Sequence, residues 1–148
     1  MSELGIKIDC SVFPSNRAHG GMPGSKINKP SLIIKNNCEI KEFPINTANF
    51  LGKSIIFSGG GYFRLFDYRV IRFLAKKSDY LMTYFHPRDF DHNQPVMDGL
   101  SYLRIFKSYV GLSTCYNKLD RFIKDFDFID LRQADLITNW KKADKVYL

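Results

Sequence analysis

The stretch that decides the fold class reads SIIFSGGGYFRLFDYRVIRFLAKKSDYLMTYFHPRDFDH and covers residues 54–92. It begins with a short apolar run at 54–57, which is typical of a buried strand, and continues into a triple glycine. Asp67 is a suitable N-cap for the amphipathic helix that follows, and a second apolar run at 80–85 ends at His86. The pattern predicts a strand, a helix and a strand of a parallel sheet, with the glycines and His86 at strand ends, where such sheets bind ligands.

The segments before this stretch predict further strands and loops. Residues 6–9 form a short strand that ends in a turn, and residues 14–30 are rich in Gly, Pro, Ser and Asn, as in a long surface loop. Residues 32–44 predict a β-hairpin, because two asparagines at 36–37 separate two apolar-alternating runs and Asn tolerates the positive φ of a tight turn. Residues 45–53 are expected to connect the hairpin to the next strand.

The segments after it predict two helices, one starting near Gly99 and one capped by Ser113, and then a strand at 126–131. The tail at 133–148 holds the only tryptophan and is expected to be a helix over a sheet edge or a loose terminus. Apolar residues at helical spacing are expected to pack into the core. In the three predicted helices these are Val70, Ile71, Phe73 and Leu74, then Leu100, Leu103, Phe106, Tyr109 and Val110, then Tyr116, Leu119, Phe122 and Ile123.

Composition limits the possible classes of protein. A chain of 148 residues with 45% hydrophobic content is long enough for one domain with a real core. Its net charge of +7 is spread along the chain without a long basic run or a nucleic-acid-binding motif, so no nucleic-acid partner is expected. The three cysteines are far apart and lack C-x-x-C spacing, which favours reduced thiols. We expect no membrane span, and a cytoplasmic location, because no apolar run or leader segment is visible.

Several motifs resemble one known family. The runs GGGYFRLFDY and YFHPRDFD, followed by FKSYVGL and DFDF, resemble the C-terminal half of polysaccharide deacetylases of the NodB-homology group. The segments GIKIDCSVFP, RAHGG and EIKEFP resemble the subgroup encoded in exopolysaccharide and surface-glycan clusters. The resemblance implies that residues 1–131 form an α/β fold, a partial (β/α) barrel with parallel strands, surface helices and a β-hairpin, and that 132–148 form a tail that we expect to be helical.

The family motifs that are missing predict that the chain is inactive by itself. Family members carry Asp-Asp, His-x-x-x-His and Arg-x-Pro motifs, which supply the metal ligands and the base, and none occurs in this chain. The resemblance therefore implies the C-terminal part of an N-acetyl sugar deacetylase, a hydrolase of C–N amide bonds, inactive without an N-terminal half. A divalent, zinc-type metal is expected only in the complete enzyme. The alternative is a non-catalytic glycan-binding or interaction module derived from the same fold.

A partial barrel also predicts an assembly. Half of a barrel leaves open strand edges and an apolar layer that would otherwise be covered. Such a surface is rarely left in water, so we expect either a partner chain that supplies the missing strands or a homodimer.

His86 is the candidate catalytic residue. It follows a predicted buried strand and precedes Asp89 and Asp91, carboxylates whose charge can influence proton binding by a histidine. In the family that it resembles, a histidine at this point protonates the leaving amine. The motif here reads Tyr84-Phe85-His86, with Tyr where the family has Leu. The alternative is a structural histidine bonded to a neighbouring carbonyl.

Five residues are candidates for contact with an N-acetylated glycan, and most of them have a structural alternative. The resemblance places Asp9 beside the active-site groove, although it could simply cap its own turn. His19 could lie in its loop by chance, and Arg64 could pair with a carboxylate and hold the glycine loop. The candidates are Asp9, Arg17, His19, Arg64 and Arg88. No metal site is predicted, since the spacing H-P-R-D-F-D-H over residues 86–92 matches no common zinc motif.

Overall fold

The computed structural model describes residues 5–13, 27–36, 38–50 and 52–148 and divides the chain into two compact units. The first unit comprises Met1–Ile56, Tyr80–Met82 and Ile129–Leu148. The second comprises Phe57–Asp79 and Thr83–Phe128. Each unit is described separately. In the part of the chain that the structure describes, no helix is both long and apolar enough to cross a bilayer.

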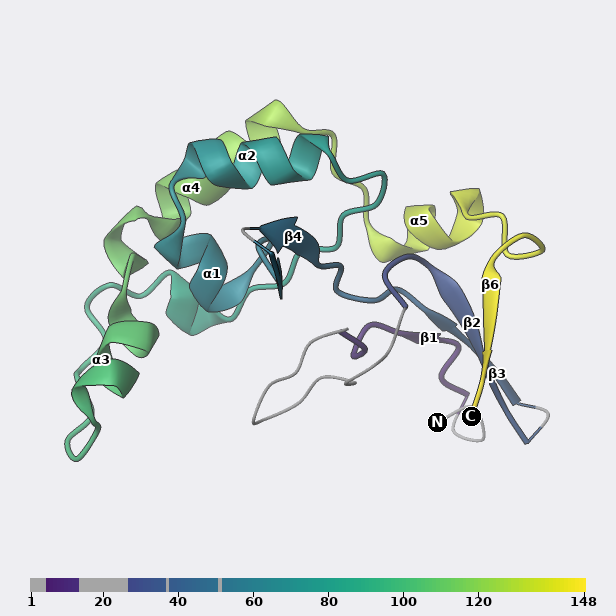
Figure 1. Cartoon of the computed structure of the whole chain (residues 1–148), viewed down its shortest axis with the longest axis horizontal. Coiled ribbons are helices and arrows are strands. Elements are labelled where there is room, and N and C mark those ends of the chain that lie inside the picture. The colour runs from purple at the N-terminus through teal and green to yellow at the C-terminus, as the bar shows by residue number, and fades with distance from the viewer. Residues whose placement is uncertain (1–4, 14–26, 37, 51) are drawn as a thin grey trace. The chain divides into compact units, whose positions relative to one another are not determined.

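A mixed four-stranded sheet organises the first unit. Its strands are β1 (Ile8–Asp9), β2 (Ser31–Lys35), β3 (Cys38–Glu42) and β6 (Asp144–Tyr147), in the order β1-β3-β2-β6. The β2–β3 pair is antiparallel, whereas β1–β3 and β2–β6 are parallel. Figure 1 shows β6 beside β2, so the last strand of the chain lies next to strands from near its beginning.

The predicted β-hairpin is confirmed. β2 and β3 pair in register from Ser31↔Glu42 to Lys35↔Cys38, and Asn36 in the turn has φ 49°, the positive value that the Asn pair predicted.

The expected connector at 45–53 is wrong, and the strand expected at 54–57 is present over Lys53–Ile55 but is antiparallel. This region forms a second small antiparallel hairpin, β4 (Ala48–Phe50) and β5 (Lys53–Ile55), with Gly52 at φ 75° in the turn. The positive φ of Gly52 reverses the chain, so β5 pairs backward with β4 instead of entering a parallel sheet.

The C-terminal tail is built into the first unit. Residues 126–131, expected to be a strand, instead lead into helix α5 (Leu131–Ile137), because Asp130 caps it by accepting a hydrogen bond from Gln133 N at 2.8 Å. The indole Nε1 of Trp140 donates to Asp135 Oδ1 at 2.8 Å, and Lys41 Nζ lies 2.6 Å from the same oxygen. The tail is thus a helix followed by an edge strand, bonded to β3 through Lys41.

The second unit contains five helical segments around an aromatic core. They are α1 (Gly60–Leu65), α2 (Tyr68–Lys76), the 3-10 helix η2 (Pro87–Asp89), α3 (Tyr102–Tyr109) and α4 (Leu112–Asp125). Asp67 is the N-cap of α2, as predicted, and accepts a hydrogen bond from Arg69 N at 2.8 Å. Figure 1 shows α2 beside α4, where the Tyr68 hydroxyl donates to Asp125 Oδ2 at 2.7 Å. Phe122, fully buried, packs at the centre of the aromatic cluster.

The parallel strand expected at 80–85 is not formed. Residues 80–85 are half-buried, and one isolated parallel bridge, Gly59↔Tyr84, is the pairing that the structure shows for them. The next residue, Gly60, has φ 55° and begins α1, so the glycine segment turns into a helix after a single bridge. The mixed α/β class with parallel strand pairs is therefore observed, but a (β/α) barrel is not.

Several apolar residues expected in the core are exposed. Helix α3 buries none of its residues, and Leu103 and Phe106 are more than half exposed. In α4, Phe122 is buried as predicted, whereas Tyr116 and Ile123 lie on the outside. In α2, Ile71 and Leu74 are buried as predicted, but the Phe73 ring is exposed under Lys77, whose Nζ lies 4.2 Å from the ring centroid. Helical spacing indicates one apolar face and does not establish that a neighbour covers it.

Gly111 provides a test of this packing. It has φ 67°, and a Cβ added there would lie 2.1 Å from the Arg64 carbonyl oxygen, whereas Gly99 has φ 76° with nothing within 4 Å. We expect Gly99→Ala to lower the free energy of unfolding by about 1 kcal/mol, the cost of the left-handed backbone, and Gly111→Ala by about 3 kcal/mol or more because of the added overlap. Urea denaturation measures both, and equal losses would contradict the close approach of Gly111 to Arg64.

Candidate functional site

A buried ion pair lies at the centre of the second unit. Arg64, in α1, places its Nε 3.0 Å from Oδ1 of Asp89, in η2, and both residues are buried. The contact is an ion pair without the in-line geometry of a hydrogen bond. A buried charge is stable in a protein only when it is paired, so each side chain requires the other.

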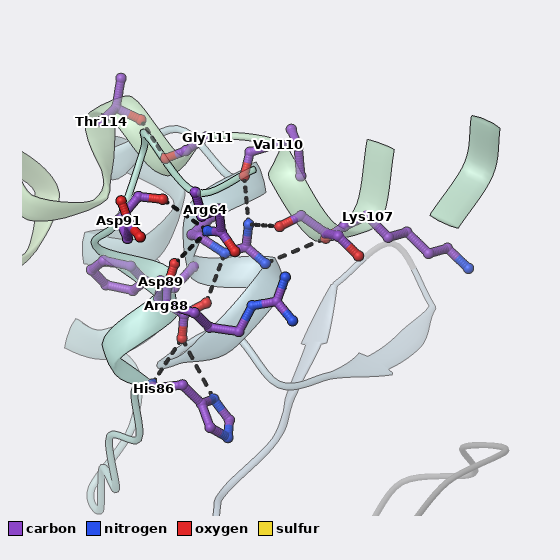
Figure 2. Close-up of polar contacts among 12 residues, drawn as sticks. Arg64, His86, Arg88, Asp89, Asp91, Lys107, Val110, Gly111 and Thr114 are labelled. Atoms are coloured by element: carbon purple, nitrogen blue, oxygen red, sulfur yellow. Dashed lines mark hydrogen bonds and ion pairs between the residues drawn. The ribbon is translucent and has the colours of Figure 1, made fainter. Parts of the chain in front are cut away.

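The remaining nitrogens of Arg64 bind the C-terminal end of α3. Nη1 donates to the carbonyl oxygens of Ser108 and Val110 at 2.8 and 3.0 Å, and Nη2 donates to that of Lys107 at 3.3 Å (Figure 2). Carbonyl groups at the end of a helix lack partners within it and carry partial negative charge. Arg64 therefore caps α3 as well as neutralising Asp89.

Lys118 of α4 makes the corresponding contact with α1. Its Nζ donates to the carbonyl oxygens of Arg64 at 2.6 Å and of Phe66 at 2.7 Å, and lies 3.4 Å from that of Phe63. Burial lowers the pKa of this ammonium group. α1 is thus held at its C-terminal end by a cation from α4, while its own cation holds α3.

His86 is the exposed residue that this buried pair orients. The backbone N–H of His86 donates to Asp89 Oδ2 at 2.9 Å, and the ring Nδ1 lies 3.6 Å from the same oxygen. The ring is 66% exposed and meets Tyr84 edge to face, with the ring centroids 6.1 Å apart. Figure 2 shows Arg64, Asp89 and His86 in sequence, from the buried cation to the exposed imidazole.

This arrangement suits proton transfer by His86. The imidazole Nδ1 lies near a buried carboxylate, at a distance longer than a hydrogen bond, and the other ring nitrogen is on the far side of an exposed ring. The sequence predicted only that the carboxylates of Asp89 and Asp91 lie near His86, and the structure places that of Asp89 beside it. The structure also reveals what orients Asp89, namely Arg64, and no local pattern of residues signals that contact.

The predicted glycan-contact residues differ in their surroundings. Arg64 adopts the alternative role considered for it, pairing with a carboxylate and holding the segment after the glycines. The Arg88 side chain is exposed, and its carbonyl oxygen accepts from Gln94 Nε2 at 2.8 Å. Arg17 and His19 lie outside the described residues.

Asp9, in the first unit, caps the turn that follows it. Its Oδ1 accepts from Cys10 N at 2.9 Å, and its Oδ2 accepts from Ser11 Oγ at 2.7 Å. The turn-capping alternative is therefore observed, and a role in glycan contact stays a prediction.

Glu42 is a residue that sequence reasoning missed. It is fully buried at the end of β3, and its Oε1 accepts from Val12 N at 3.0 Å. Burial and, to a smaller extent, the nearby Asp9 charge raise the pKa of Glu42 to about 7 against the lowering effect of the Val12 N–H. Alternation along β3 places Glu42 on the same face as Ile40, which was the available signal that it points inward.

The described side chains do not form a metal donor set. Among them, no group of three or more His, Cys, Asp or Glu residues is placed to hold an ion. In the H-P-R-D-F-D-H segment, Asp89 points inward to Arg64, whereas Asp91 accepts from Asn93 N at 3.1 Å. These residues do not fit the divalent metal that the family resemblance implies for a complete enzyme.

Comparison with known proteins identifies the family. A family model described as a domain of unknown function, DUF3473, matches residues 10–135, which is most of the chain. The chain belongs to the DUF3473 family. No curated protein and no solved structure matches it. The description of DUF3473 names no activity, so a function must be argued from the residues of this domain.

Removal of Arg64 tests the centre of the DUF3473 domain. We expect Arg64→Ala to lower the free energy of unfolding by about 3–5 kcal/mol, because Asp89 would remain buried without its cation. Arg88→Ala is a matched control on an exposed neighbour, and its effect should stay within about 0.5 kcal/mol. Urea denaturation followed by circular dichroism measures the free energy of unfolding of both variants. If Arg64→Ala lost as little stability as Arg88→Ala, the buried pair would not be required for folding.

Proposed function

We propose that this chain is the C-terminal part of a polysaccharide deacetylase that modifies a surface or extracellular glycan. The proposal is supported by the DUF3473 match, a family known in the context of polysaccharide deacetylases, and by the sequence resemblance. The observation that carries it is the exposed imidazole of His86 beside the buried Asp89, which accepts a hydrogen bond from the His86 backbone N–H. That is the arrangement a general acid requires.

In this proposal His86 protonates the leaving nitrogen. Cleavage of an N-acetyl group breaks the amide C–N bond, and the departing amine must gain a proton. His86, when charged, donates that proton from its exposed side, while Asp89 holds the ring and Arg64 holds Asp89. The exposed guanidinium of Arg88, two residues from His86, can donate hydrogen bonds to sugar hydroxyl or carbonyl oxygens.

The rest of the reaction requires groups from elsewhere. A divalent metal in the complete enzyme would supply an activated water to attack the amide carbonyl. The side chains described here do not fit that metal, and we assign no step to it. The chain alone should therefore not hydrolyse amides.

The exposed apolar surface of the second unit supports the need for a partner. Val96, Met97, Tyr102, Leu103 and Phe106 are each more than half exposed, and all lie within one segment of eleven residues at 96–106. Clustered exposed apolar side chains commonly mark an interface. An N-terminal half-enzyme chain is the partner that the proposal favours, and a second copy of this chain is the alternative.

Deacetylase activity tests the proposal directly. The assay measures acetate release from N-acetylglucosamine oligomers by this chain, by an N-terminal half carrying the missing motifs, and by their mixture. We expect activity in the mixture alone, reduced about 10²–10⁴-fold by His86→Ala through loss of the general acid. His92→Ala is the matched control, since His92 is an exposed histidine in the same segment, and should leave the rate unchanged.

Other results would favour the second candidate function, a glycan-binding module without catalysis. The lack of a metal donor set among the described residues also fits a glycan-binding module without catalysis. Binding of the oligomers by the lone chain, without turnover in any mixture, would support that module. Full activity of His86→Ala in an active mixture would rule out His86 as the acid.

A further inference from the structure

The carboxyl groups of Asp9 and Glu42 meet in the first unit, at the ends of two strands. β1 and β3 run parallel, and Asp9 and Glu42 are register partners at the last position of each strand. Register partners in neighbouring strands point to the same face of a sheet. Their carboxyl groups therefore share one face of the sheet, where a hydrogen bond between them would require a proton on one of the two groups.

The surroundings of Glu42 do not suit an ionised carboxylate. Glu42 is fully buried, and among the described residues one donor, Val12 N, reaches its Oε1, while none reaches Oε2. A buried carboxylate that lacks hydrogen bonds is costly. Asp9 is the better site for the negative charge, because it is half-buried and both of its oxygens already accept hydrogen bonds from Cys10 N and Ser11 Oγ.

The other described groups around the pair supply no positive charge. Cys10 and the Tyr80 phenol face Glu42, and burial raises the pKa of each, that of Cys10 to about 11, so both are neutral at ordinary pH. Ser31 of β2, the register partner of Glu42 on the other side, directs its hydroxyl to Lys29 O. Lys41, the residue before Glu42, is paired with Asp135. Within the described part of the chain, neither Asp9 nor Glu42 takes part in an ion pair.

We propose that folded Glu42 keeps its proton to a higher pH than an ordinary glutamate does and donates it to Asp9, so that the two side chains share one negative charge and fix the end of β1. The proton resides on Oε2, which lacks any other partner, and Oε1 remains free to accept from Val12 N. Asp9 keeps the charge.

The consequence is a positioning role for Glu42. β1 contains two residues, so its backbone pairing alone is a weak attachment. Glu42 accepts a hydrogen bond from Val12 N, after the turn, and in this proposal it donates a second one to Asp9, before the turn. It therefore sets the position of the Asp9 carboxylate, which the sequence resemblance places beside a glycan groove. The proposal for Glu42 does not depend on deacetylase activity.

The proposal predicts a definite pH dependence. The unfolded chain releases the Glu42 proton near the ordinary glutamate pKa of 4.5, whereas the folded protein, with its raised pKa, holds it to about 7. The stability that this proton provides is therefore fully present below pH 4.5 and is lost as the pH rises through about 7. Within this window the contribution to the folding equilibrium constant falls by up to tenfold per pH unit, about 10²-fold in total.

Two measurements on the full chain test the proposal. Carbon-13 NMR of the Glu side-chain carboxyls in the unaltered protein should show Glu42 titrating near pH 7. Urea unfolding across the same pH range then compares the unaltered protein with Glu42→Gln, whose amide can donate to Asp9 and accept from Val12 N at every pH. The ratio of their folding constants should change about 10²-fold from about pH 4.5 to about pH 8. Glu39→Gln, at an exposed position of the same strand, should leave that ratio within about twofold.

Two results would overturn the proposal. One is a Glu42 carboxyl that titrates at an ordinary pKa, and this measurement needs no variant. The other is a Glu42→Gln protein whose loss of stability is the same at every pH, because that would show an ionised Glu42 paired with a cation.

Discussion

The position of Arg64 is the constraint on which the second unit depends. A guanidinium cannot give up its proton, so its burial is possible only if its donors face acceptors. The acceptors come from two segments far apart in the sequence, the Asp89 carboxylate of η2 and the last carbonyl groups of α3. One side chain therefore fixes three helical segments relative to each other. The same Asp89 accepts a hydrogen bond from the backbone N–H of His86, so it also fixes the backbone that carries the exposed imidazole.

Polar contacts hold this unit together where apolar contacts are few. α3 buries none of its residues, so it cannot be held by a hydrophobic face, and its C-terminal carbonyl groups are bound by Arg64 instead. α1 is only six residues long, too short to be stable alone, and Lys118 binds its C-terminal carbonyl groups. In both cases a cation offsets the partial negative charge at a helix end. The apolar faces remain available for contact with a partner.

Features that depend on neighbouring residues could be predicted from the sequence, and features that depend on distant residues could not. The Asp67 cap and the hairpin turn at Asn36 follow from residues within a few positions, and both are present. The apolar run at 80–85 has the composition of a strand, but a strand needs a paired neighbour, and Gly59 offers a single bridge before the chain becomes helical. Likewise the inward direction of Asp89 depends on Arg64, which is 25 positions earlier.

The two units bury carboxyl groups in opposite ways, and the difference explains what each can do. Asp89 lies beside the Arg64 guanidinium, which compensates a buried carboxylate, and the same carboxylate accepts a hydrogen bond from the backbone N–H of His86. Glu42 lies beside another carboxyl group with no cation among the described residues, so its burial favours the neutral form, which can donate as well as accept a hydrogen bond. A charged buried carboxylate suits a role in supporting proton transfer, whereas a neutral one suits a structural bond. The partner of each carboxyl group, more than its burial, therefore determines its chemistry.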